Sequence, residues 1–547
     1  MPEAAGLAIV GAQVWTGNPA QPLAEAVAVA GSRIRAVGTN AEALAAAGPG
    51  ARVLDARGRR VVPGFDDTHV HFFTGGDALA SADLRGAASP GELRERLARY
   101  AATRPPGEWI LHGNWDHERW TPADLPTAAL IDDVTPEHPV WVHRSDLHMA
   151  LANTLAMKLA GVTSDAADMP GGEIVRGPAG RPTGIFKDAA TSLVERAIPP
   201  PSPARILEAI RAAQDLAAAH GVTSVHDMGV LGGRGAETML EVLRAYQTLE
   251  RRGELKVRVS AHLPLAEWRR VAEAEPMPGG HRLRVGAVKS FVDGSLGSST
   301  AWFYEPYADA PGVSGGPSDE LADPERHYRR IRDADAAGIQ VALHAIGDRA
   351  NALALDLWER LAADNGARDR RGRIEHAQHL RPEDVARFVA ARVIASVQPY
   401  HCLDDGRWAE KRLGPARARL SFSFRSLIEA GAVVAFGSDW SVAPLDPLLT
   451  IHAAVTRRTL DGRNPAGWMP EQKLSVAQAV RACTWQGAYA SGEERLKGSI
   501  EPGKLADLAL LSDDIFAIDP ERIRDTRVDV TVFDGRIVHQ SETSDRL

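Results

Sequence analysis

Short apolar runs recur along the middle of the chain and are separated by longer stretches with helical spacing. Seven of these runs lie at residues 222–229, 256–264, 284–294, 340–348, 372–379, 393–400 and 433–440. Between two of them, residues 204–221 carry apolar side chains at 206, 207, 210, 213, 216 and 217, which is the spacing of one helix face. The pattern therefore predicts an α/β fold in which strands alternate with helices.

An eighth run precedes these seven and ends in PGFDDTHVHFF at residues 63–73. Eight strand–helix units are the number found in a (β/α)8 TIM barrel. Residues from about 75 to 203 separate the first strand from the second, which is far too long for an ordinary connection. Because this stretch has strand-like and helical pieces of its own, we expect a subdomain inserted over the barrel mouth.

The two ends of the chain resemble each other. LAIVGAQVWTG and EAVAVAGSRIRAVG near the start, and ADLALLSDD and VTVFDGRIVHQ near the end, read as short strands separated by turn residues. Asp534 and Gly535 form a dipeptide typical of β-hairpin turns. We therefore predict a small β-sandwich built from residues 1–62 and 491–547, enclosing a barrel domain at 63–490.

Composition narrows the class of protein. The 547 residues are 44% hydrophobic and 24% charged, and the net charge is 63 − 71 = −8 without long charged runs. This balance argues against a nucleic-acid partner or an acidic membrane surface. The N-terminus has no basic leader, and no stretch has the length of a membrane span, so a cytoplasmic enzyme is expected.

The two cysteines, Cys402 and Cys483, are too few for a disulfide framework or a cysteine-rich zinc site. Any metal must therefore be held by histidine, carboxylate or modified lysine. His69 and His71 are two residues apart, so in an extended strand they point to the same side, where two imidazoles suit a divalent metal such as zinc.

Further candidate ligands lie where other barrel strands are expected to end. They are Lys289, His344, His376 and Asp439, on the fourth, fifth, sixth and eighth strands. Taken singly, a histidine after an apolar run is more often structural, and an aspartate there is often a helix cap. Because the carboxyl ends of barrel strands form one face, these side chains together predict a metal centre there.

The sequence resembles the metal-dependent amidohydrolase superfamily. It is most similar to the amidohydrolase family 3 branch, which includes YtcJ-like proteins and N-substituted formamide deformylases. The resemblance covers nearly the whole chain. It is carried by PGFDDTHVHF, the Trp-Asp of GNWDHERW, RSDLHMALAN, GGEIVRGPAGRPTGIFKD, VKSFVDGSLGSSTAWFYEPY, ALHAIGDRAN, RIEHAQHL, FGSDWSVAPLDPL and GSIEPGKLADLALL.

This resemblance implies a centre of one or two divalent ions, with zinc as the expected metal. His69 and His71 would hold one ion, and His344 and His376 a second. Lys289 would bridge the two as a carbamate formed with CO₂. Asp439 would contact the first ion, accept a proton from water and pass it to the leaving nitrogen.

Alternatives stay open at three positions. Lys289 could instead be a buried lysine paired with Asp293. His379 lies three residues after His376, but the odd spacing turns it to the other face of a strand, which favours His376 as the ligand. Ser299 stands where related sequences commonly have arginine, in the motif GSRTA, and is expected to alter selectivity.

Five residues are candidates for substrate binding: Trp115, Asp116, His148, Asp293 and Tyr400. Trp115 could equally be packed in the inserted subdomain. Asp293 and His148 could instead orient a ligand imidazole, and Tyr400, at the expected end of strand seven, could donate a hydrogen bond to a developing oxyanion. His226 ends strand two, and here a structural role is favoured.

The sequence therefore predicts a metal-dependent hydrolase that cleaves a non-peptide C–N bond in an amide, an N-substituted formamide or a cyclic amide. Rival interpretations keep the metal but change the reaction to hydrolysis of an ester or carbamate, or to deamination. A further rival is a non-catalytic regulatory protein on a hydrolase scaffold. The expected partner is a small-molecule amide, with no nucleic acid or membrane, and a homodimer is left open.

Overall fold

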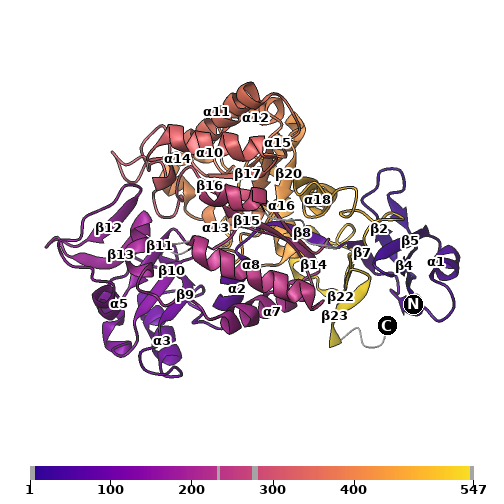
Figure 1. Cartoon of the computed structure of the whole chain (residues 1–547), viewed down its shortest axis with the longest axis horizontal. Helices are drawn as coiled ribbons and strands as arrows, with labels where there is room; N and C mark the ends of the chain where they lie inside the picture. The colour runs from indigo at the N-terminus through magenta and orange to yellow at the C-terminus, as the bar shows by residue number, and fades with distance from the viewer. Residues whose placement is uncertain (1–5, 231–234, 274–280, 543–547) are drawn as a thin grey trace.

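The computed structural model describes residues 6–230, 235–273 and 281–542 (Figure 1). Its largest sheet has eight strands in the order β20-β19-β18-β17-β16-β15-β14-β8, and all neighbouring pairs are parallel. A parallel bridge between Val70 and Trp440 joins the first strand to the segment after the last. The sheet is therefore a closed barrel, as the sequence predicted.

The barrel strands are short and lie close to their predicted positions. They are β8 (Phe65–Val70), β14 (Val222–Asp227), β15 (Arg258–Pro264), β16 (Leu283–Phe291), β17 (Gln340–Ala345), β18 (Arg373–His376), β19 (Ile394–Val397) and β20 (Val434–Phe436). The sixth and seventh strands end earlier than expected. His376 has a φ of 72° and leaves the extended conformation, while Pro399 begins helix α13 (Pro399–Asp405). Tyr400 therefore lies on a helix and not at a strand end.

Helices cover the outside of the barrel. The longer ones are α7 (Pro203–Ala219), α8 (Gly235–Arg251), α10 (Pro324–Ala336), α11 (Asp348–Asn365), α12 (Pro382–Ala390), α14 (Ala409–Ala418) and α16 (Pro447–Thr456). In α7, Ser202 caps the first turn by accepting the Arg205 N–H, and the buried face includes Ile206 and Ile210. Within the described ranges, no helix combines the length and apolarity needed to cross a bilayer.

The insertion lies between α2 (Phe72–Ala78) and α7 and forms a body of its own beside the barrel (Figure 1). Its five-stranded sheet has the order β12 (Gly172–Arg176), β13 (Pro182–Asp188), β11 (Met149–Ala152), β10 (Val140–Arg144) and β9 (Ile110–Trp115). Helix α3 (Pro90–Ala101) packs Leu93 and Leu97 into the core of this sheet. The insertion can therefore present its loops to the barrel mouth on a rigid support.

The two ends of the chain combine into a β domain, as predicted. One sheet has the order β23 (Arg536–Gln540), β22 (Val528–Phe533), β21 (Leu508–Leu511), β7 (Arg60–Pro63), β2 (Gln13–Trp15) and β3 (Leu23–Ala24). The other consists of β5 (Arg33–Gly38), β4 (Ala26–Ala30), β1 (Leu7–Val10) and β6 (Arg52–Asp55). A shared core includes Ile9, Val27 and Val530. Asp534 and Gly535 form the predicted hairpin turn, with φ values of 51° and 77°.

A buried ion-pair cluster joins the barrel to this β domain. Arg258, on β15, donates from Nε to Asp507 Oδ2 at 2.7 Å and from Nη2 to Asp534 Oδ1 at 3.0 Å. Only 3% of the Arg258 side chain is exposed. Removing one partner from a buried pair leaves an uncompensated charge, which is a large penalty.

We expect Arg258→Met to lower the free energy of unfolding by about 3–5 kcal/mol, because Asp507 would remain buried without its partner. Urea denaturation followed by circular dichroism measures this loss. Arg94→Met removes the exposed Arg94–Asp133 pair and is the matched control, with an expected loss below about 1 kcal/mol. Equal losses in the two variants would contradict the structural role of Arg258.

Candidate metal centre

His69, His71 and Asp439 meet at the carboxyl end of the barrel. His69 lies on β8, His71 follows this strand directly, and Asp439 follows β20 with a φ of 59°. Nε2 of each histidine is 3.5 Å from Asp439 Oδ1. Ligands about 2.1 Å from a tetrahedral zinc ion are roughly 3.4 Å from each other, so this spacing fits one ion.

The other ring nitrogen of each imidazole already has a partner. His69 Nδ1 is 2.6 Å from Glu375 Oε2, and His71 Nδ1 is 2.8 Å from the Gly229 carbonyl oxygen. Because both partners are acceptors, they hold the proton on Nδ1 and leave Nε2 free to bind a metal. Burial lowers the pKa of His71 to about 4, so its imidazole is neutral at pH 7.

Lys289, His344 and His376 lie against this pair. Lys289 Nζ is 3.4 Å from His69 Nε2, and burial lowers the pKa of the lysine to about 8. The rings of His344 and His376 have centroids 4.5 Å apart. His376 Nδ1 contacts Gln398 Oε1 at 2.8 Å, which directs its Nε2 away from this partner. The fold therefore brings together all six residues that the sequence singled out as ligands.

The donor set fits a divalent cation. Asp439 Oδ1 is buried and has no hydrogen-bond partner among the described residues, although the imidazoles of His69 and His71 both face it. An unsatisfied buried carboxylate oxygen is costly, and a bound cation would satisfy it. Neutral imidazoles and carboxylate are ligands that zinc prefers.

His401 is a member of the cluster that the sequence reasoning missed. It lies on α13, with Nε2 3.8 Å from Asp439 Oδ2, and its ring stacks on His376 at 6.2 Å and 14°. It follows the segment that was expected to be strand seven. A search for histidines that also covered the first helical turn after each expected strand would have found it.

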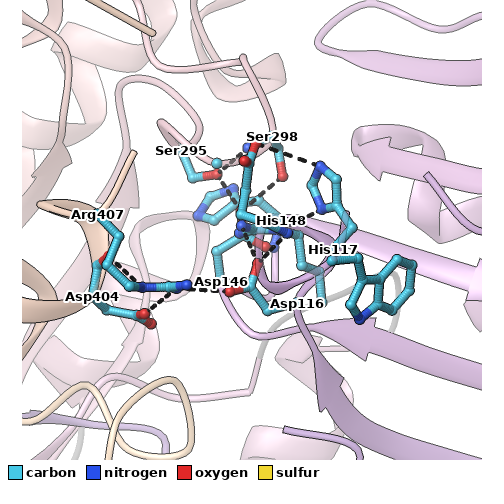
Figure 2. Close-up of polar contacts among 12 residues, drawn as sticks. Asp116, His117, Asp146, His148, Ser295, Ser298, Asp404 and Arg407 are labelled. Carbon is cyan, nitrogen blue, oxygen red and sulfur yellow. Dashed lines mark hydrogen bonds and ion pairs between the residues drawn. The ribbon is translucent and has the colours of Figure 1, made fainter. Parts of the chain in front are cut away.

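The ligands lie in a cavity of about 770 Å³, a volume that includes its open mouth. The far wall is polar and is shared by the insertion and the barrel loops (Figure 2). Arg144, at the end of β10, contacts Asp116 and Asp146 at 2.9 Å each. Asp146 Oδ2 in turn accepts hydrogen bonds from Ser295 at 2.6 Å and Ser298 at 2.8 Å.

Three of the five predicted substrate-binding residues line this cavity: Asp116, His148 and Tyr400. Asp116 joins the insertion to the barrel, because its Oδ2 accepts from Arg407 Nη2 at 2.9 Å (Figure 2). His148 Nδ1 is 2.7 Å from Asp188 Oδ1, and its ring lies 5.3 Å from that of His344.

Trp115 and Asp293 do not line the cavity, which corrects the expectation that they contact substrate. Trp115 is fully buried in the core of the insertion, and its indole N–H donates to the Val142 carbonyl at 2.8 Å. Asp293 accepts backbone N–H groups of Trp302, Ile346 and Gly347. These bonds occupy the carboxylate of Asp293, so the alternative pairing with Lys289 is also wrong.

The remaining sequence candidates have structural surroundings. His379 does not line the cavity and contacts Ser421 Oγ through Nδ1 at 2.7 Å, which agrees with the preference for His376. His226 is buried and pairs with Arg373 Nη1 at 2.7 Å. Ser299 Oγ accepts from Arg412 Nη1 at 3.2 Å, so a guanidinium from α14 reaches the position where the GSRTA motif would have arginine.

The closed barrel and the buried histidine–carboxylate cluster at its mouth define a metal-dependent hydrolase. Residues 52–539 match the model described as "Amidohydrolase family", and the chain belongs to this family.

Curated relatives agree with this assignment. The chain is 39% identical to Protein LONG AFTER FAR-RED 3 of Arabidopsis thaliana, over 93% of this chain and 87% of the relative. It is 31% identical to Putative amidohydrolase YtcJ of Bacillus subtilis, over 90% of this chain and 91% of the relative. It is 29% identical to N-substituted formamide deformylase of Arthrobacter pascens, over 97% of each. These relatives confirm the YtcJ-like branch that the motifs indicated.

A solved structure resembles the whole chain. It is an uncharacterized metal-dependent hydrolase from Pyrococcus horikoshii, with 27% identity and a TM-score of 0.75. The likeness covers 94% of this chain and 99% of that one. The β domain and the insertion are therefore part of the shared architecture and are not additions to it.

Glu375 should control how tightly the centre binds metal, because it fixes the tautomer of His69. We expect Glu375→Gln to weaken zinc binding by about 10–100-fold, the usual effect of losing an outer-shell partner. Competition with a chromophoric chelator measures the dissociation constant. Glu320→Gln is the matched control, since Glu320 is a half-buried glutamate that accepts from Ser290 and makes no hydrogen bond to a candidate ligand. Unchanged affinity in a folded Glu375→Gln protein would refute this role.

Proposed function

We propose that the protein hydrolyses a non-peptide C–N bond in an amide, an N-substituted formamide or a cyclic amide. The observation that carries the proposal is the cluster of neutral imidazoles around Asp439 at the base of an accessible cavity. A bound divalent ion supplies Lewis acidity that activates water and polarises a carbonyl group. N-substituted formamides are the most specific substrate class proposed, on the similarity to the Arthrobacter pascens deformylase.

We assign the proton transfers to Asp439. Its carboxylate faces the cavity between the two histidine pairs, and burial raises its pKa to about 7. A carboxylate with this pKa can accept a proton from attacking water and give it to the leaving nitrogen near neutral pH. The Tyr400 hydroxyl, on the cavity wall, would donate to the carbonyl oxygen as negative charge develops there.

The proposal extends to the modification of Lys289. Because burial lowers its pKa to about 8, an appreciable fraction of the amine is uncharged near neutral pH. The neutral amine can add CO₂ and release one proton, which leaves a carbamate. This carbamate would place a carboxylate beside His69 and favour a zinc centre with two ions.

Rival reactions differ in the bond that is broken. An esterase, a carbamate hydrolase or a deaminase would use the same ligands, because metal and proton transfer are common to all these reactions. A non-catalytic regulatory protein would not need them. The retention of every expected ligand, together with an open cavity, favours catalysis over a scaffold role.

A substrate panel tests the reaction class. Purified zinc-loaded protein is assayed against N-substituted formamides, the matching acetamides, cyclic amides, and esters with the same acyl groups. We expect the highest kcat/KM for a C–N substrate, with the formamides first. Turnover confined to esters would replace the proposal by the esterase alternative, and metal without turnover of any compound would favour the scaffold.

His69→Ala is expected to lower the zinc content and to abolish turnover, because it removes one of two imidazoles from the same ion. Elemental analysis and the substrate assay measure the two effects, and far-ultraviolet circular dichroism checks that the barrel remains folded. His539→Ala, on β23 of the terminal β domain, is the matched control and should retain both properties. Full activity with full metal in His69→Ala would refute the assignment.

A further inference from the structure

A second cavity lies between the insertion and the barrel, next to the metal cavity. Its volume is about 1020 Å³, including its open mouth. The insertion contributes residues of β9, β10 and the segment 191–201, and the barrel contributes residues of α2, α7 and α8. Among the described residues, Leu147 alone lines both cavities. We call this second space the side cavity.

Much of the wall of the side cavity is apolar. Its apolar residues include Phe73, Leu111, Ile198, Pro199 and Val230. The described residues of this wall contain no group of histidines and carboxylates at the spacing of metal ligands. An apolar pocket with a few polar groups is the usual form of a small-molecule site. The side cavity therefore suits an organic ligand and not a metal ion.

The charged groups of this wall already have partners. Asp77 accepts from Arg205 Nε at 2.6 Å and from Arg205 Nη2 at 2.7 Å, and His112 Nε2 is 2.8 Å from Asp77 Oδ2. Glu195 Oε1 lies 3.6 Å from His143 Nε2. An ion is costly to bury unless an opposite charge meets it. Because each carboxylate already faces a basic side chain, the side cavity favours an uncharged ligand.

Two buried ring nitrogens of the wall have no hydrogen-bond partner among the described residues. They are Nε1 of Trp141 and Nδ1 of His143. Both residues lie on β10 and are two positions apart, so their side chains share one face of the strand, with ring centroids 5.7 Å apart. Buried polar atoms are nearly always paired. Two neighbouring unpaired nitrogens in the wall of a cavity therefore point to a missing ligand.

The two nitrogens require opposite partners. The Trp141 indole N–H can only donate a hydrogen bond. The Glu195 carboxylate faces Nε2 of His143, which favours the proton of the neutral ring on Nε2 and leaves Nδ1 as an acceptor. A carboxamide has both matching groups on adjacent atoms, because its carbonyl oxygen accepts and its N–H donates. A ketone or an ester could satisfy Trp141 but not His143.

We propose that the side cavity is a second, non-catalytic binding site for a small uncharged carboxamide with an apolar substituent, held by Trp141 and His143. The site lies outside the metal centre and does not depend on which bond the protein cleaves. Its occupant would contact Leu147, whose neighbours Asp146 and His148 line the metal cavity. Binding would therefore act on a segment that both cavities share.

The test is isothermal titration calorimetry of the full-length protein with two probes of the same shape. Phenylacetamide has the N–H donor, and phenylacetone lacks it. Both are titrated into the zinc-loaded wild type and into His69→Ala, in which turnover would not consume the amide. We expect phenylacetamide to bind both proteins with the same dissociation constant, and phenylacetone to bind about 10-fold more weakly because Nδ1 of His143 stays unpaired.

Trp141→Phe keeps an aromatic ring and removes the N–H donor, so it should bind phenylacetamide about 10-fold more weakly. Trp109→Phe is the matched control, because Trp109 packs against the same hydrophobic cluster of the insertion but does not line the side cavity. It should bind as the wild type does. If Trp141→Phe fails to fold, His143→Phe removes the acceptor and should bind the amide no better than the ketone.

The outcomes separate this proposal from the proposed function. Equal affinity of the wild type for the two probes, or unchanged affinity for the amide in a folded Trp141→Phe, would overturn the site. Amide binding that is lost in His69→Ala but kept in Trp141→Phe would assign the probe to the metal cavity instead. Binding that depends on Trp141, in a protein that turns over no C–N substrate, would contradict the proposed function and leave the side cavity site standing.

Discussion

The hydrogen bond from the Asp439 backbone N–H to the His69 carbonyl oxygen, 2.7 Å long, is the contact on which the centre depends. It lies where the last barrel strand meets the first, next to the bridge between Val70 and Trp440. Closure of the sheet therefore brings together two residues that are 370 positions apart in sequence. Every other ligand is positioned relative to this seam, because the remaining strands follow in order around the ring.

A series of buried hydrogen bonds and ion pairs in the barrel interior supports the metal ligands. Glu375 holds His69 and pairs with Arg373 at 2.7 Å, and Arg373 reaches His226. His226 Nε2 lies 3.2 Å from Asp66 Oδ1, and Asp66 Oδ2 accepts from Lys497 at 2.5 Å. Such groups are stable in a barrel interior only when each has its partner. The metal ligands are thus linked through the barrel to the segment that leads into the C-terminal strands.

The cavity wall and the metal ligands come from different parts of the chain. The ligands belong to the barrel, whereas Arg144, Asp116 and Asp146 belong to the insertion and meet barrel loops through Ser295 and Ser298 (Figure 2). A family can keep one set of metal ligands and still change its substrate by altering such a wall. Because of this division, membership of the amidohydrolase family identifies the type of reaction, whereas the substrate depends on the cavity wall.

The sequence by itself determined the barrel, the insertion, the two-ended β domain and the ordered ligands at the strand ends, because these follow from local periodicity and from the geometry of parallel strands. Only the tertiary structure decided that Trp115 fills a core, that Asp293 binds backbone amides, and that His401 faces Asp439 from a helix. The direction of a loop or helix side chain depends on partners distant in sequence, and no local pattern encodes them.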